Sequence, residues 1–271
     1  MIRKTRLKSI KKQHDKNYLQ EIISKDRNLV LGNDTYAMAF RAFNWYAMRD
    51  MGMKMSEVHN AFHASMFVFG IQLIMIYFVY FIIFGPTAEV VPPANLSVIV
   101  ARFLCSILMH LQVEGDLRQG LKMMKYVTNQ PFDFSNPSAA FSVAMMQCLG
   151  GLAAEIGCIV YLSSLNKALD VIIKFVALSS IAKVDDFYAA ALPADGNKVK
   201  GRKCKPLQIN VHQRDWKRFS EHSDISEYEP MAKSGLGRKI QRFIFKVLRI
   251  IYASYIFYFL PYTMLWLPYI F

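Results

Sequence analysis

Cysteine is scarce in this chain, and the few cysteines are not arranged for chemistry. The 271 residues contain four cysteines, and no two of them form a CxxC pair. Cys105, Cys148 and Cys158 lie within apolar runs, whereas Cys204 lies alone in a basic stretch. Because zinc sites and disulfide frameworks need paired or clustered cysteines, the sequence predicts neither.

Catalytic motifs are also lacking. The sequence contains no Gly-rich phosphate loop, no nucleophile elbow and no cluster of metal ligands, so we expect a non-enzymatic protein without cofactor or metal. Acidic residues are outnumbered by 33 Lys+Arg to 20 Asp+Glu, which gives a net charge of +13. This excess is divided between two segments that flank apolar runs, so it does not indicate a nucleic-acid-binding surface.

Long apolar runs dominate what remains. Hydrophobic residues make up 54% of the chain, and the mean hydropathy is +0.19. Residues 64–84 carry no charge and end at Gly85-Pro86, where proline cannot continue a helix. Residues 250–271 are also uncharged. Since about 20 apolar residues cross a bilayer, both runs are predicted to span a membrane.

Three further segments are long enough to span but contain ionisable side chains. The predicted spans are 97–113, 138–162 and 168–188. Their charged residues include Arg102, Glu155, Asp170 and Lys174. Charges are costly in lipid, so these helices should form the interior of a bundle. The sequence thus predicts an all-α, multi-pass helical membrane protein with about five transmembrane helices.

The basic residues predict the topology. Residues 1–56 contain 12 basic and 5 acidic residues (net +7), and residues 193–249 contain 14 and 6 (net +8). Both segments are therefore expected in the cytoplasm, with the carboxyl terminus outside. The loop before the second span then lies outside, where Asn95 begins a glycosylation sequon.

This topology divides the chain into four parts. They are a basic cytoplasmic segment 1–63, a four-helix membrane bundle 64–192, a basic cytoplasmic segment 193–249 and a final span 250–271. We expect a plasma membrane or endomembrane location. The mitochondrial inner membrane is the less favoured alternative.

An amphipathic helix is predicted before the first span. Asp34 can cap a helix, and Tyr36, Phe40, Phe43 and Ala47 follow at intervals of four, three and four. This pattern is typical of a helix on the inner membrane surface. An ordinary helix packed under the bundle has the same pattern, so both interpretations stay open.

Small residues recur in the third predicted span. Gly150, Gly151, Ala154 and Gly157 lie on adjacent helical turns. Small side chains let two membrane helices approach closely, so we expect a neighbouring helix against them.

Ionisable residues in the spans are predicted to form one layer. With 1.5 Å rise per residue, Arg102, Glu155 and Lys174 would lie at similar depth below the outer surface. We expect Glu155 to meet Lys174, with Asp170 one turn from Lys174. The layer is interpreted either as a structural ion pair or as an ion or proton site.

Residues 238–249 form a basic amphipathic pattern, RKIQRFIFKVLR. Calmodulin targets share this pattern, but so does any helix that leads from anionic headgroups into a span, and the second interpretation is favoured. The expected partners are anionic lipid at the cytoplasmic face and other membrane subunits or further copies of the chain.

The chain resembles a recurrent pattern in uncharacterised multi-pass membrane proteins of ciliates. The resemblance covers about residues 97–192 and the carboxyl-terminal end. It is carried by MMKY at 123–126 with Asn129, Gln147, Gly150-Gly151 and Glu155, then by FVAL at 175–178, Ile181-Ala182 and DDFY at 185–188. No activity, ligand or partner is implied by it.

Two functions fit these features. The first is a non-catalytic scaffold or accessory subunit of a membrane complex. The alternative is an ion or proton channel or transporter formed by oligomerisation, because five spans without an internal repeat are few for a carrier.

Overall fold

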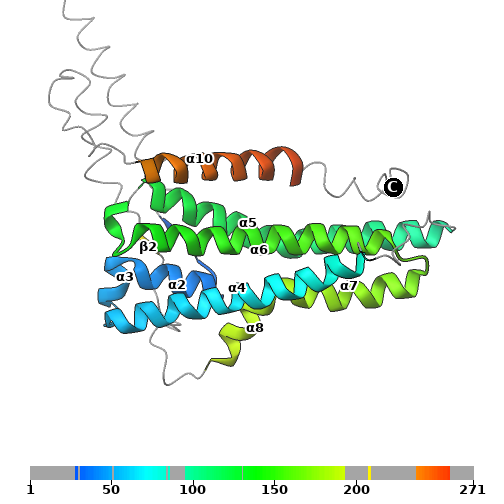
Figure 1. Ribbon diagram of the computed structural model, residues 1–271, viewed down its shortest axis with the longest axis horizontal. Coiled ribbons are helices and arrows are strands. Elements are labelled where there is room, and N and C mark those ends of the chain that lie inside the picture. Colours follow the sequence, from blue (N-terminus) through cyan, green and yellow to red (C-terminus); the bar gives the residue numbers. More distant parts are fainter. Residues whose placement is uncertain are drawn as a thin grey trace, which may run out of the picture. The chain divides into compact units, whose positions relative to one another are not determined.

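The computed structural model describes residues 28–29, 31–50, 52–83, 85, 95–129, 131–192, 207–208 and 236–256. The chain divides into two compact units. One contains two short strands, β1 (Asn28–Leu29) and β2 (Leu207–Gln208), which pair antiparallel. The other contains the helices of the described part of the chain (Figure 1).

Helices make up almost all of the described structure. They are α2 (Thr35–Phe43), α3 (Trp45–Asp50), α4 (Met55–Ile83), α5 (Leu96–Asn129), the short 3-10 helix η1 (Pro131–Asp133), α6 (Pro137–Ser163), α7 (Ala168–Ala182), α8 (Val184–Ala191), α10 (Leu236–Ile250) and the π-helical turn η4 (Ile251–Ile256). Three of them, α4, α5 and α6, are long and apolar enough to cross a membrane. The predicted helical, multi-pass class is confirmed to this extent. The predicted fifth span lies outside the described residues beyond Ile256.

Helices α4, α5, α6 and α7 run up and down beside one another (Figure 1). Helix α4 is parallel to α6, because Gln72 lies beside Gly150 and Tyr80 lies beside Gly157. Helix α5 is antiparallel to α6 and parallel to α7, as its contacts with both helices show. We call the two ends of this bundle the Arg102 end and the Asp34 end.

The segment 168–188, predicted as one span, is divided into two helices. Helix α7 ends at Ala182, and Lys183 adopts φ −103° and ψ 12° before α8 begins. The fifteen residues of α7 rise about 22 Å, less than the bilayer core of about 30 Å. No proline or glycine marks this break in the sequence.

Helix α2 is buried on all sides. Asp34 caps it as predicted, because its carboxylate accepts a hydrogen bond from the Ala37 N–H at 2.7 Å. All nine residues of α2 are buried against α4, α6 and α8. The interpretation as a helix on the membrane surface is therefore wrong, and the alternative of a packed helix is right.

The Gln72 amide shows how α2 is placed. It accepts a hydrogen bond from the Tyr36 hydroxyl of α2 at 2.6 Å and donates to the Ile181 carbonyl of α7 at 3.5 Å. Helix α2 thus lies next to the point where α7 ends. It completes the bundle at the Asp34 end.

The outer face of α5 is apolar towards the Arg102 end. On α5, exposed Val100, Leu104, Leu108 and Leu111 recur at intervals of three and four, and Leu111 is 65% exposed. The opposite face of this helix buries polar groups. A polar interior under an apolar exterior is typical of a protein that lies in lipid.

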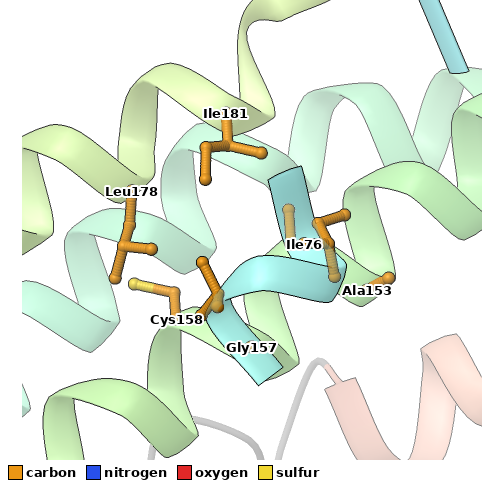
Figure 2. A pocket seen from close by; sticks show the side chains of 8 residues that line it. Ile76, Ala153, Gly157, Cys158, Leu178 and Ile181 are labelled. Atoms are coloured by element: carbon orange, nitrogen blue, oxygen red, sulfur yellow. The ribbon is translucent and has the colours of Figure 1, made fainter. Parts of the chain in front are cut away.

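The small residues of α6 lie against two neighbours. Gly150 and Gly157 face α4, whereas Gly151 faces Val113 and Leu117 of α5. Ala154 is also buried and lines a small apolar cavity between α4, α6 and α7 (Figure 2). The side chains labelled around this cavity are Ile76, Ala153, Gly157, Cys158, Leu178 and Ile181.

Candidate functional site

A histidine and a glutamate form an ion pair inside the bundle. Nδ1 of His110 on α5 lies 2.7 Å from Oε1 of Glu155 on α6. The Glu155 side chain is 0% exposed and that of His110 is 10% exposed. His110 lies fourteen residues after the first residue of α5, which corresponds to about 21 Å along the helix. The pair therefore lies within the predicted spans 97–113 and 138–162.

The Glu155 carboxylate is only half satisfied. Its Oε2 is buried and has no hydrogen-bond partner among the described residues. The nearby hydroxyl of Ser106, one turn from His110, donates instead to the Arg102 carbonyl at 2.9 Å. Burying a charged oxygen without a partner is costly, so this atom is the least satisfied point of the pair.

Arg102 lies at the end of the bundle rather than beside Glu155. Its Nε and Nη2 donate to the Leu165 carbonyl at 3.2 and 2.8 Å. Leu165 follows the last residue of α6, so the guanidinium lies at the carboxyl end of that helix. A cation at this place is favoured by the helix dipole and by the unpaired terminal carbonyls.

The predicted contact between Glu155 and Lys174 is absent from the ion pairs of the described residues. Lys174 and Asp170 are both exposed on α7, whereas Glu155 is fully buried. The expected single layer is wrong for a geometric reason. Arg102 contacts Leu165, whereas Glu155 contacts His110. Leu165 lies ten residues after Glu155, so Arg102 and Glu155 are at different depths in the bundle.

His110 was visible in the sequence as a polar residue of the second span, but its role was not predicted. It lies eight residues after Arg102 and four after Ser106, so all three share one face of α5. That spacing is a signal for a polar face. It does not identify the residue of α6 that the face meets.

A second polar cluster lies at the Asp34 end. The Asp34 carboxylate accepts a hydrogen bond from the Gln119 amide at 2.7 Å, and Gln119 in turn accepts one from the Gly32 N–H at 2.8 Å. Gln147 of α6 lies 3.4 Å from Gln119. These contacts join the start of α2 to α5 and α6. We call this group the inner polar cluster.

Carboxylates gather where α7 gives way to α8. Lys183 Nζ lies 3.3 Å from Asp116 Oδ2 and 3.2 Å from Asp186 Oδ2. Asp185 is 2% exposed, and the hydroxyl of Thr35 donates to its main-chain carbonyl at 2.8 Å. Its Oδ1 has no partner among the described residues.

Burial changes the acidity of this region. Desolvation, together with the nearby carboxylates of Asp34, Asp116 and Asp186, raises the pKa of Asp185 to about 8. Desolvation also raises the pKa of Asp34, although its hydrogen bonds oppose this. At neutral pH, Asp185 is therefore mostly protonated and uncharged.

Neither site is arranged for metal binding or nucleophilic chemistry. In the helices and strands that the structure describes, no three His, Cys, Asp or Glu side chains form a group suited to a metal ion. Cys105, Cys148 and Cys158 are buried free thiols. The chemistry open to these groups is proton binding and ion pairing.

Helix α10 presents a different kind of surface. It carries five basic residues and no acidic one in fifteen residues. One face lies on the bundle, where Leu248 is buried and Gln241 contacts Ser138 at 3.5 Å. Just after α10, the hydroxyl of Tyr252 donates to Glu114 at 2.7 Å.

A stripe of apolar side chains on α10 is exposed. Its members recur at intervals of four, three, four and three: Leu236, Ile240, Phe243, Val247 and Ile250. Phe243 is 68% exposed. We call these five residues the α10 stripe. The α10 stripe and the basic residues lie on different, adjacent faces of the helix, so one partner could contact both faces.

Asn95, the predicted glycosylation residue, is exposed and immediately precedes α5. Its main-chain carbonyl accepts hydrogen bonds from the N–H groups of Val98 and Ile99. The basic amino-terminal residues 1–27 lie outside the described part of the chain.

Comparison with known proteins gives no match. No family model matches the chain, and neither the curated proteins nor the solved structures contain a significant relative.

Proposed function

We propose that this chain is a non-catalytic, multi-pass membrane protein that acts as a scaffold or accessory subunit of a membrane complex. The observation that carries this proposal is α10. One face of this helix is fixed to the bundle, while the α10 stripe and the basic side chains of Lys239, Arg242, Lys246 and Arg249 are exposed. The cavity between α4, α6 and α7 supports the same function, since it is small and apolar and such a cavity does not conduct ions.

The proposed topology has five spans. Helices α4, α5 and α6 are the first three, α7 with its short length is the fourth, and residues 250–271 are the fifth. The Asp34 end and residues 193–249 lie in the cytoplasm, by the positive-inside rule. Reporter tags at the two termini should appear on opposite sides of the membrane. Tags on the same side would contradict this count.

The partner of α10 is proposed to be an acidic protein with an apolar groove. A helix with apolar side chains at i, i+4 and i+7 fits such a groove, as amphipathic helices generally do. Like charges disfavour pairing of α10 with a second copy of itself, because it has five basic residues and no acidic one. Calcium-loaded calmodulin has this chemistry and is a suitable probe.

The experiment combines purification with variants of α10. The protein is extracted in mild detergent, and the mass of the particle and of each component is measured. In the scaffold proposal, a stable hetero-complex is lost in Ile240→Ser/Phe243→Ser and weakened in Arg242→Glu/Lys246→Glu. The matched control Leu169→Ser removes an exposed leucine of α7 and should leave the complex intact.

Transport is the second candidate, and the buried His110–Glu155 pair is the observation that favours it. Ionisable residues within membrane helices commonly lie on proton or ion paths. A symmetric homo-oligomer that carries protons or ions across vesicle membranes would support this function over the scaffold. A monodisperse hetero-complex without flux would support the scaffold.

A further inference from the structure

The His110–Glu155 pair has features that a purely structural ion pair does not need. Glu155 is 0% exposed, and its Oε2 lacks a hydrogen-bond partner among the described residues. A structural pair in a low-dielectric interior is stable when the remaining lone pairs are also satisfied. In this pair, one oxygen of the Glu155 carboxylate forms no hydrogen bond within the described residues.

His110 is the accessible member of the pair. Its side chain is 10% exposed, and Nδ1 is engaged with Glu155 at 2.7 Å. Nε2 is therefore the ring atom left for exchange with an outside donor. When Nδ1–H donates to the carboxylate and Nε2 is bare, the pair carries one negative charge. A proton on Nε2 makes the pair neutral overall, which a low-dielectric interior favours.

We propose that His110 and Glu155 form a buried proton-binding site inside the bundle. A proton bonds to Nε2 of His110 and leaves a donor water molecule or hydronium ion, and no electrons are transferred. The Glu155 carboxylate holds the resulting imidazolium through Nδ1–H. This inference does not depend on the scaffold proposal.

A proton suits this site better than a metal ion. One free carboxylate oxygen and one imidazole are too few ligands for a metal ion, which usually takes four to eight. The titratable groups nearest in sequence position to the pair on the surrounding elements include Arg102, Cys105, Glu114, Asp116 and Arg118 of α5, Cys158 and Tyr161 of α6, Tyr77 and Tyr80 of α4, and Asp170, Lys174 and Lys183 of α7 and its end. Tyr252, just after α10, contacts Glu114.

None of these groups replaces Glu155 as the partner of His110. Arg102 donates to Leu165, Glu114 pairs with Arg118, and Asp116 pairs with Lys183. Asp170 and Lys174 are exposed on α7. Glu155 is thus the one acid among the described residues that forms an ion pair with His110.

The test is a titration of the His110 ring in the full-length protein. Imidazole nitrogens are labelled with ¹⁵N, the protein is placed in lipid nanodiscs, and the ring signals are followed by NMR from about pH 4 to pH 9. His110 should titrate reversibly with the fold retained. In Glu155→Gln its proton affinity should fall by at least tenfold, because the imidazolium loses its carboxylate.

The exposed histidines provide the internal reference. His59 and His63 on α4 are exposed, so their ring signals report any general effect of Glu155→Gln on the protein. Glu114→Gln removes another carboxylate from α5 and should change the His110 affinity far less than Glu155→Gln does. A His110 ring that stays in one protonation state over the whole range in the wild type would overturn the proposal. This result decides the question even if Glu155→Gln does not fold.

Discussion

The two ends of the bundle differ in the acidic and basic groups that they bury. At the Arg102 end, the outer face of α5 is apolar, and the interior holds Arg102 and a single acid, Glu155, paired with a single histidine. At the Asp34 end, four aspartates and one lysine gather around α2, α5 and α8. The first end buries one acid with one histidine and one arginine, whereas the second keeps an excess of acid.

The contrast follows from what surrounds each end. The outer exposed side chains of α5 are Val100, Leu104, Leu108 and Leu111, so an uncompensated charge beneath them would have no water nearby. The Asp34 end is closed by α2 and α8, whose main chain and side chains supply hydrogen bonds. Extra acid is tolerated there because protonation neutralises it. Each variant below disturbs one side of this comparison.

The largest effect is expected when one member of the His110–Glu155 pair is removed. His110→Leu leaves the Glu155 carboxylate buried without its partner, which should lower the free energy of unfolding by about 3 to 5 kcal/mol. Denaturant unfolding in detergent micelles, followed by circular dichroism, measures this loss.

The double variant His110→Leu/Glu155→Leu serves as the control for that loss. It replaces the pair with apolar side chains and should regain most of the stability, because no charge remains unpaired. If the double variant is as unstable as His110→Leu, the loss comes from packing rather than from charge.

Part of the pH dependence of stability should come from Asp185 at the Asp34 end. The pKa of Asp185 is raised from 3.8 to about 8 in the folded protein. Between these values the folded state holds a proton that the unfolded state has released. The contribution of Asp185 to stability is therefore largest at low pH, falls as pH rises through this window and is constant above about pH 8.

Asp185→Asn removes the contribution of Asp185 and leaves those of Asp34 and Asp116. The amide is neutral at all pH values, so at pH 8 the variant should be more stable than the wild type by on the order of a few kcal/mol. Near pH 4 the two proteins should unfold at similar denaturant concentrations. Parallel pH profiles for wild type and variant would show that Asp185 is not the titrating group.

The third largest loss of stability is expected where α6 packs closely against α5. A Cβ atom at Gly151 would lie 3.1 Å from Val113 Cγ1 and 3.4 Å from Leu117 Cδ2, so Gly151→Leu must push α5 away. We expect a loss of about 1 to 3 kcal/mol. At Gly157 the same atom would lie 3.5 Å from the Tyr80 ring, an ordinary contact. Gly157→Ala should therefore be tolerated, and thermal unfolding of both variants tests the difference.

Much of the fold could be predicted from local sequence signals. Helix α6 begins at Pro137 and ends at Ser163, close to the predicted 138–162, and α5 ends at Asn129 as the Asn-Gln-Pro sequence indicates. Charge-free runs and proline stops act over a few residues. They therefore mark the position of a helix along the chain without any knowledge of its neighbours.

The unpredicted features depend on contacts distant in sequence. The periodicity of α2 predicts one buried face, yet all of its faces are buried because it lies next to the end of α7. Likewise, the partner of Glu155 depends on how far α5 slides along α6. Arg102 reaches the Leu165 carbonyl and so fixes this stagger. Spacing within one helix does not contain that information.

The smallest effect is expected at Lys174, where the sequence had predicted a buried partner for Glu155. Lys174 is exposed on α7, and a long lysine side chain can carry its charge away from apolar surface. Lys174→Met should change stability by no more than about 0.5 kcal/mol, as is usual for exposed positions. Thermal unfolding beside His110→Leu tests this directly. A loss as large as that of His110→Leu would mean that Lys174 is buried in an assembly, and the buried charges of the Arg102 end would then include one from α7.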